Sequence, residues 1–282
     1  MRELPIGYID SGLGGLTVVK QSLKQLPNES IIYLGDNERA PYGPRSSQEV
    51  KRYIWQLTNF LREKGIKMLV IACNTGTAAA LDELRATLAI PVVGVIHSGC
   101  RTAIKRTTSG KVGVIGTQGT INSNMYENVM LDKVNSLNIM SIACPEFVEI
   151  VEEHRINDKK TQTIIEERLR PFKEAQVDSL VLGCTHYPLL YDQITNVMGE
   201  NVIIIDSGVE TINEVSMLLD YFNLSRTAEE AREHPPTQEI YTTGQVDEFQ
   251  EFAKSWLDQS EIVVKKAHIK GEIIVEDNNS ES

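Results

Sequence analysis

The segments MLVIACNTGTAAALDELR (68–85) and SLVLGCTHYPLLYDQITN (179–196) follow one pattern, and that pattern decides the fold. Each begins with an apolar run typical of a buried strand and continues with residues spaced as in a helix. Between the two elements stands a cysteine, Cys73 in the first segment and Cys184 in the second. Strands and helices that alternate along a chain indicate an α/β fold with mainly parallel sheets.

The repeat extends beyond these two segments. Two further pairs flank them: IGYIDSGLGGL (6–16) with KVGVIGTQGTI (111–121), and PVVGVIHSG (91–99) with NVIIIDSG (201–208). The three pairs recur in the same order, and the first glycine precedes the cysteine by 66 positions in one copy and by 71 in the other. We therefore expect an internal duplication: two pseudo-symmetric α/β domains, with helices flanking the sheets and the active site in the cleft between them.

The predicted first domain is discontinuous. It comprises residues 1–97 and 208–282, and the second domain comprises residues 98–207. The segment that follows the repeat has no counterpart in it, so we expect it to pack back on the first domain. That segment predicts a helix at 209–222 and a polar connector at 226–238.

Smaller signals place the other elements of the first domain. Ser46 and Glu49 are spaced as in a capping box and predict that a helix begins there, after a loop at 37–45. The predicted strands are residues 5–10, 30–36, 67–72 and 91–96.

The composition of the 282 residues, 41% hydrophobic and 24% charged, is that of a soluble globular protein. A formal net charge of -11 argues against nucleic acid or an anionic membrane as a partner, because both require a basic surface. We find no apolar run that could span a bilayer and no signal-peptide core in MRELPIGYID. Four scattered cysteines favour reduced thiols and hence a cytoplasmic location.

Cys73 and Cys184 are the strongest candidates for chemistry. Each is expected at the carboxyl edge of a parallel sheet, where clefts form, and at a helix N-terminus, which lowers a thiol pKa from about 8.5. Burial as a small apolar residue is the alternative for either cysteine alone. Two thiols at matching positions favour a reaction in which a proton leaves one face of a carbon and returns to the other. Cys100 and Cys144 lack this context and are expected to be structural.

Two ionisable residues are placed to assist the thiols. Asp10 ends the first strand, and His186 follows Cys184 by two positions, so each thiol has a neighbour that can accept or relay its proton. The alternatives are a helix N-cap for Asp10 and a hydrogen-bonded helix-start residue for His186.

The turn SGLGGLT (11–17) lacks the lysine of a P-loop and matches G-x-G-x-x-G only in part, so a nucleotide is disfavoured. Its N–H groups can instead hold carboxylates. The polar side chains expected to join them are Ser11, Asn74, Thr75 and Thr185. Tyr42 and Gly43 are predicted either to close over the ligand or to form an ordinary surface turn. No zinc-binding spacing is present and no lysine stands where pyridoxal phosphate would need one, so we expect neither metal nor cofactor.

With these motifs the chain resembles the glutamate racemases, cofactor-independent enzymes that supply D-glutamate for bacterial peptidoglycan. The motifs are IDSGLGGLTV (9–18), YLGDNERAPYGPRS (33–46), ACNTGTA (72–78), CPEFVEIVE (144–152) and LGCTHYP (182–188). The resemblance covers most of the chain and is less distinctive beyond Gly208.

The resemblance implies a two-base 1,1-proton transfer at Cα of glutamate. Cys73 would act on D-glutamate with support from Asp10, and Cys184 on L-glutamate with support from His186. A glutamate near that histidine falls on Glu152, with Glu149 and Glu153 as alternatives. The implied substrate contacts are Asp10, Ser11, Tyr42, Gly43, Asn74, Thr75, Thr117, Thr120, Thr185 and His186. The resemblance also implies L- and D-glutamate as ligands and a homodimer.

Three rival functions stay open. A racemase for another amino acid, such as aspartate, shares the two cysteine motifs, although the long GDNERAPYG loop favours glutamate. A periplasmic-type binding module would bind a small anion without turnover. A thiol redox protein would need the two cysteines to form a disulfide, which no C-x-x-C motif supports.

Overall fold

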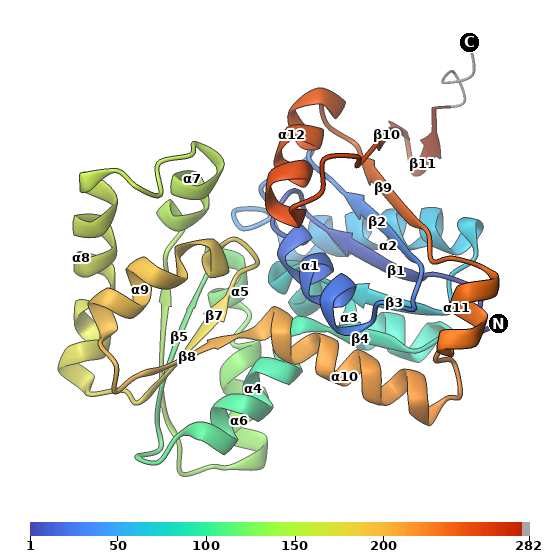
Figure 1. Ribbon diagram of the computed structural model, residues 1–282. Coiled ribbons are helices and arrows are strands. Elements are labelled where there is room, and N and C mark those ends of the chain that lie inside the picture. Colours follow the sequence, from blue (N-terminus) through green and yellow to red (C-terminus); the bar gives the residue numbers. More distant parts are fainter. Residues whose placement is uncertain (278–282) are drawn as a thin grey trace.

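Two separate β-sheets organise the chain, and in Figure 1 the smaller one lies with its helices on the left. A computed structural model describes residues 1–277. The larger sheet has the strand order β11-β10-β9-β2-β1-β3-β4, and the smaller has the order β6-β5-β7-β8. All neighbouring strands are parallel except β10 and β11.

The strands are β1 (Ile6–Asp10), β2 (Ile31–Gly35), β3 (Met68–Ile71), β4 (Val92–Gly94), β5 (Lys111–Gly116), β6 (Asn138–Ala143), β7 (Ser179–Gly183), β8 (Ile203–Asp206), β9 (Gln238–Thr242), β10 (Val264–Lys270) and β11 (Ile273–Glu276). The helices are α1 (Leu16–Gln25), α2 (Ser47–Lys64), α3 (Asn74–Thr87), α4 (Val95–Arg106), α5 (Gln118–Asn122), α6 (Met125–Lys133), α7 (Glu146–Glu152), α8 (Lys159–Ala175), the 3-10 helix η1 (Tyr187–Leu190), α9 (Tyr191–Met198), α10 (Ser207–Tyr221), α11 (Ala228–Glu233) and α12 (Val246–Leu257). The predicted fold class, α/β with mainly parallel sheets flanked by helices, is confirmed.

The two sheets wind in the same order. The run β2-β1-β3-β4 in the larger sheet corresponds to β6-β5-β7-β8 in the smaller one. The pairing register agrees too, because Gly7 pairs with Leu69 and Gly113 pairs with Leu180. Both leucines stand four positions before the cysteine of their segment. Both glycines allow a close approach: an added Cβ would lie 2.8 Å from a side-chain atom of Ile66 or Leu180. This is the arrangement that an internal duplication predicts.

Helices α4 and α10 carry the chain between the sheets and pack against each other. The predicted domain boundaries, after residues 97 and 207, fall inside α4 and at the start of α10. Strands β9, β10 and β11 join the larger sheet beyond β2, so the last part of the chain lies beside the first. The exact division into domains stays a prediction.

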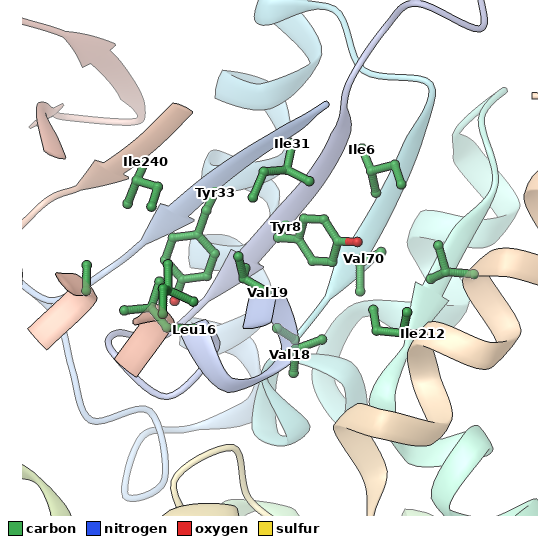
Figure 2. Packing of buried hydrophobic residues seen from close by; sticks show 14 of the residues in the cluster. Ile6, Tyr8, Leu16, Val18, Val19, Ile31, Tyr33, Val70, Ile212 and Ile240 are labelled. Carbon is green, nitrogen blue, oxygen red and sulfur yellow. The ribbon is translucent and has the colours of Figure 1, made fainter. Parts of the chain in front are cut away.

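Helices cover both faces of the larger sheet. Figure 2 shows Tyr8 and Tyr33 on one face, packed with Val18 and Val19 of α1 and near Ile212 of α10. On the other face α2 and α3 pack against the same strands. The first strands are therefore buried on both sides, as their continuous apolar runs predict.

Two sequence predictions were wrong in detail. The run at 91–96 is a strand only to Gly94, because Val95 and Ile96 already belong to α4; short apolar runs do not distinguish the two states. The connector at 226–238 contains α11, which begins at a capping box formed by Thr227 and Glu230. The capping box predicted at Ser46 is confirmed. Within residues 1–277 no helix is long and apolar enough to cross a membrane.

A buried ion pair lies at one end of the larger sheet, the end opposite the pocket described below. Lys67 is fully buried and donates to the carboxylate of Glu29 and to the carbonyl oxygen of Leu224, the latter at 2.9 Å. Removing one partner leaves the other charge buried and uncompensated, so Lys67→Met should lower the free energy of unfolding by about 3 kcal/mol. Urea unfolding measures this. Lys20→Met, which breaks an exposed pair with Asp258, should lower it by less than about 1 kcal/mol, and equal losses would contradict the expectation.

Candidate active site

A pocket lies where the carboxyl ends of strands from the two sheets meet. Its lining comes from the segments after β1, β2 and β3 of the larger sheet, from those after β5 and β7 of the smaller sheet, and from α7. The lining residues are Ser11, Gly12, Ala40, Pro41, Tyr42, Gly43, Cys73, Asn74, Thr75, Thr117, Val148, Glu152, Cys184, Thr185 and His186. The free volume is about 30 Å³, roughly the space of one water molecule.

The structure brings most of the candidate residues of the sequence together. Both candidate cysteines line this one pocket, one from each sheet. Asp10 and Thr120 are fully or almost fully buried and lie outside the lining. Four lining residues, Gly12, Ala40, Pro41 and Val148, were not among the individual site residues predicted from the sequence. Val148 stands one helical turn before Glu152, and that i, i+4 spacing is the signal that could have found it.

Cys73 is the N-cap of α3, as expected, but its pKa moves in the direction opposite to the prediction. Its Sγ accepts a hydrogen bond from the N–H of Gly76 at 3.2 Å and lies 3.7 Å from Oγ of Ser11. Burial, followed by the charge of Asp10, raises the pKa of the Cys73 thiol to about 12 and outweighs these two contacts. The expectation that the helix N-terminus lowers this pKa was therefore wrong, because desolvation is the larger effect.

Asp10 lies behind Cys73 and shapes the turn that follows β1. Its Oδ2 accepts from the N–H of Gly12 at 3.1 Å and from that of Gly15, the N-cap of α1, at 2.8 Å. Burial raises the pKa of Asp10, while the charge of His186 and the backbone N–H groups oppose the rise. Within the described chain Oδ1 of Asp10 has no hydrogen-bond partner. Gly15, and not Asp10, is the N-cap of α1, so the alternative role of Asp10 as a helix N-cap was wrong.

The second thiol has a different setting. Cys184 is followed by η1, a short 3-10 helix, instead of a full α-helix. Its Sγ lies 3.7 Å from Nδ1 of His186, whose Nε2 lies 3.0 Å from Oε1 of Glu152. Burial lowers the pKa of His186, but the hydrogen bonds with Cys184 and Glu152 outweigh it and raise the pKa to about 10. The raised pKa favours the protonated, positively charged ring at neutral pH.

Of the three candidate glutamates, Glu152 is the one whose carboxylate meets His186. Glu153 instead pairs with Arg155 at 2.6 Å, and Glu149 is exposed and does not line the pocket.

The glycine turn (11–17) contacts the segment that follows Cys184. A Cβ added at Gly14 would lie 2.2 Å from Oγ1 of Thr185 and 2.6 Å from Nδ1 of His186. Next to it, Oγ1 of Thr17 donates to the carbonyl oxygen of Thr185 at 3.0 Å. The turn thus holds the segment after Cys184 in place, a role that spacing along the sequence does not reveal.

The loop at 37–45 is a fixed wall of the pocket. Tyr42 is buried, and its hydroxyl donates to the carboxylate of Asp36. Asp36 also accepts from Nε of Arg39 at 2.7 Å and from Oγ1 of Thr243, after β9, at 2.9 Å. Of the two alternatives for Tyr42, the ordinary surface turn is excluded, because the side chain is buried. Gly43 lies beside Thr117, whose Cβ would be 3.0 Å from a Cβ added at Gly43.

Three threonine hydroxyls, two of them from lining residues of the pocket, join the two halves of the molecule. Oγ1 of Thr75 lies 2.9 Å from that of Thr117 and 3.2 Å from that of Thr120, which are 3.1 Å from each other. Thr75 belongs to α3 and the other two to the start of α5. Among residues 1–277 no three His, Cys, Asp or Glu side chains gather as a metal site would require.

The fold and this pocket can be compared with known proteins. A family model described as Asp/Glu/Hydantoin racemase matches residues 7–215, which is most of the chain. The chain belongs to this family. It is therefore a racemase, an isomerase, and the resemblance drawn from its sequence motifs is confirmed.

Individual relatives agree along the whole length. This racemase is 52% identical over 268 residues to a glutamate racemase of Enterococcus faecalis, an alignment that covers 94% of this chain and 96% of the relative. The crystal structure of glutamate racemase isoform RacE1 from Bacillus anthracis superposes with a TM-score of 0.90 at 41% identity and covers 97% and 100% of the two chains. A glutamate racemase from Francisella tularensis, crystallised in complex with D-glutamate, gives a TM-score of 0.86 at 32% identity and covers 96% and 99%.

Proposed function

We propose that this racemase interconverts L- and D-glutamate by a two-base proton transfer between Cys73 and Cys184. The observation that carries the proposal is that one thiol from each sheet lines the same pocket. Relatives of about 50% identity are named glutamate racemases, and a solved relative was crystallised with D-glutamate, which supports glutamate as the substrate.

In the direction from L- to D-glutamate, the thiolate of Cys184 removes the α-proton and the thiol of Cys73 donates its proton to the opposite face of Cα. The C–H electron pair stays on Cα until the new C–H bond forms, so no oxidant or reductant is needed. Cys73, with a pKa of about 12, is held as the thiol that this direction requires. The protonated His186 is an ion-pair partner for the thiolate of Cys184.

In the reverse direction the thiolate of Cys73 is the base. Its proton must first leave the sulfur, and the buried carboxylate of Asp10, with one oxygen free among the described residues, is the acceptor. His186 then supplies the proton that Cys184 delivers. The carboxylates of the substrate are surrounded or supported by backbone N–H groups of the glycine turn, by the backbone of Gly43 and by the side chains of Ser11, Tyr42, Asn74, Thr75, Thr117, Thr120 and Thr185. The backbone N–H groups that face the α-carboxylate stabilise the charge that develops at Cα.

The pocket is closed around less space than an amino acid needs. Its free volume of about 30 Å³ would admit roughly one water molecule. We therefore propose that glutamate binds to a more open form in which the two sheets lie further apart, and that closure then excludes water from the reacting carbon. Because Asp36 fixes the loop at 37–45, the moving parts in this proposal are the two halves, with α4 and α10 between them.

The proposal extends to the setting of the enzyme. We propose that it works in the cytoplasm as a homodimer and that its D-glutamate is used for peptidoglycan, as the resemblance to the glutamate racemases implies. We also propose the domain division 1–97 with 208–282, and 98–207. Light scattering on the purified protein tests the dimer, and a mass near 31.5 kDa would exclude it.

Racemisation in deuterated water tests the mechanism. Pure L- or D-glutamate is incubated with the protein, circular dichroism follows the loss of optical activity, and mass spectrometry follows deuterium at Cα. A two-base mechanism places deuterium in the newly formed enantiomer, with little in recovered substrate at early times. Equal early labelling of both enantiomers would point to a single base.

The rival functions give different results in the same assay. Loss of optical activity with aspartate but not with glutamate would replace the proposed substrate. Tight binding of glutamate without turnover, unchanged when both pocket cysteines are alanine, would favour a binding module. A disulfide between the two cysteines under mild oxidant would favour a redox protein; all four cysteines are free in the described chain.

Removing the carboxylate that contacts His186 should change the pH dependence. The pKa of His186 is raised to about 10, so its positive charge is present below that pH and is lost as the pH rises through it. Glu152→Gln removes one cause of the rise, and the basic limb of the kcat/KM profile should move to lower pH by about one unit. Glu149→Gln, on the same helix, is the matched control. A shift in the control, or none in Glu152→Gln, would contradict the role of Glu152.

A further inference from the structure

The amide of Asn74 is only half satisfied. Asn74 follows Cys73, is buried and lines the pocket. Its Oδ1 accepts a hydrogen bond from the hydroxyl of Tyr126 at 2.7 Å. Its Nδ2 is buried and has no partner among residues 1–277. A buried amide donor without a partner costs free energy, so the position is explained if a bound ligand accepts from it.

Tyr126 reaches this amide from the other half of the molecule. It lies on α6, which covers the smaller sheet, whereas Asn74 begins α3 of the larger one. The ring of Tyr126 packs over Gly183, where an added Cβ would lie 3.0 Å from it. Gly183 directly precedes Cys184. One side chain therefore contacts the residue before one thiol and the residue after the other.

The chemistry of the two groups fixes the orientation of the amide. Burial raises the pKa of Tyr126 well above its ordinary value, so the phenol keeps its proton and acts as a donor. The partner that suits a donor is the amide oxygen, and the amide nitrogen then faces away from the phenol. Without the hydroxyl, the two orientations of the amide would differ much less in free energy.

We propose that Tyr126 is a positioning residue for racemisation: its hydroxyl holds the Asn74 amide so that Nδ2 donates to a carboxylate of the bound substrate. This inference rests on the proposed function, because it needs a substrate with a carboxylate in this pocket. It assigns no direct contact between Tyr126 and the substrate.

The variant Tyr126→Phe tests the inference, since phenylalanine keeps the ring that packs over Gly183 and removes only the hydroxyl. A contact made equally in the ground state and the transition state affects KM and leaves kcat unchanged. We expect KM for glutamate to rise about tenfold, the size of one hydrogen bond to a charged group, with kcat within about twofold of the wild type. The two enantiomers have equal free energy, so kcat/KM must fall equally in both directions.

Tyr8→Phe is the matched control. Its hydroxyl is also buried and forms a hydrogen bond of 2.6 Å with Ser22, away from the pocket. Both variants should lose a similar amount of stability in urea, and only Tyr126→Phe should change KM. A change in KM of the same size in the control would mean that lost stability explains the effect, and would overturn the inference.

A double-mutant cycle with Asn74→Ala separates positioning from a general weakening of the site. If Tyr126 acts through Asn74, the double variant should match Asn74→Ala alone within about twofold. Independent, multiplying effects would overturn the inference, as would an unchanged KM in Tyr126→Phe. If the wild type itself fails to racemise glutamate, the proposed function fails and the inference with it, so the two failures are distinguished in one assay.

Discussion

Replacing either pocket cysteine with serine should lower racemisation about 1000-fold, because each thiol is one of the two acid–base groups. A serine hydroxyl is a much weaker acid than a thiol and does not supply the anion needed to remove an α-proton. The loss should be the same in both directions: L- and D-glutamate have equal free energies in water, so kcat/KM for the two directions must stay equal in every variant. Circular dichroism from either pure enantiomer measures it.

Deuterium separates the two cysteines where the rates cannot. With Cys73→Ser, Cys184 is intact, and L-glutamate should exchange its α-proton for deuterium without inversion. With Cys184→Ser, the same should hold for D-glutamate. Cys144→Ser is the control, because Cys144 is buried outside the pocket and should leave most of the activity. Full activity in either pocket variant would refute the assigned roles.

The second large effect is expected at Gly14. A methyl group there would overlap Thr185 and His186, with distances of 2.2 and 2.6 Å that no real contact allows. Either the turn or the segment after Cys184 has to move, and a displacement of about 1 Å at a reacting group lowers the rate about 100-fold. Gly14→Ala should therefore lose at least about 100-fold in kcat while it remains folded by circular dichroism.

Gly12→Ala is the matched control for this change. Gly12 belongs to the same turn, but an added Cβ would come no closer than 3.4 Å to a neighbour, an ordinary contact. We expect less than a tenfold loss for this variant. Similar losses in the two variants would show that the turn tolerates no side chain anywhere, and the specific contact with His186 would then not explain the effect.

The repeated strand–cysteine–helix pattern was sufficient to predict the fold class, because apolar runs and helical periodicity are local properties of the sequence. The same pattern placed both thiols at strand ends that meet at one pocket. It could not predict the pKa of Cys73, because desolvation depends on how completely the other half covers the sulfur. The sequence indicates the helix whose dipole lowers a thiol pKa, but it does not indicate how deeply the sulfur is buried, which raises that pKa.

The residues missed by sequence reasoning share a cause. Tyr126 carries no motif and acts through a contact with a residue 52 positions earlier. Gly14 was recognised as part of a glycine-rich turn, but its reason for being glycine lies in Thr185 and His186, far along the chain. In contrast, α11 was missed although its capping box was visible in the sequence at Thr227 and Glu230.

The position of β9 beside β2 has a consequence for how the protein is made. On the ribosome the nascent chain completes the smaller sheet, up to β8, while the larger sheet still lacks β9, β10 and β11. Until those strands emerge, β2 presents an unpaired edge, which is a site for association with other chains. The larger sheet therefore begins first and is completed last. A message truncated before residue 238 would encode every pocket-lining residue, yet it would yield a chain in which the edge of β2 stays unpaired.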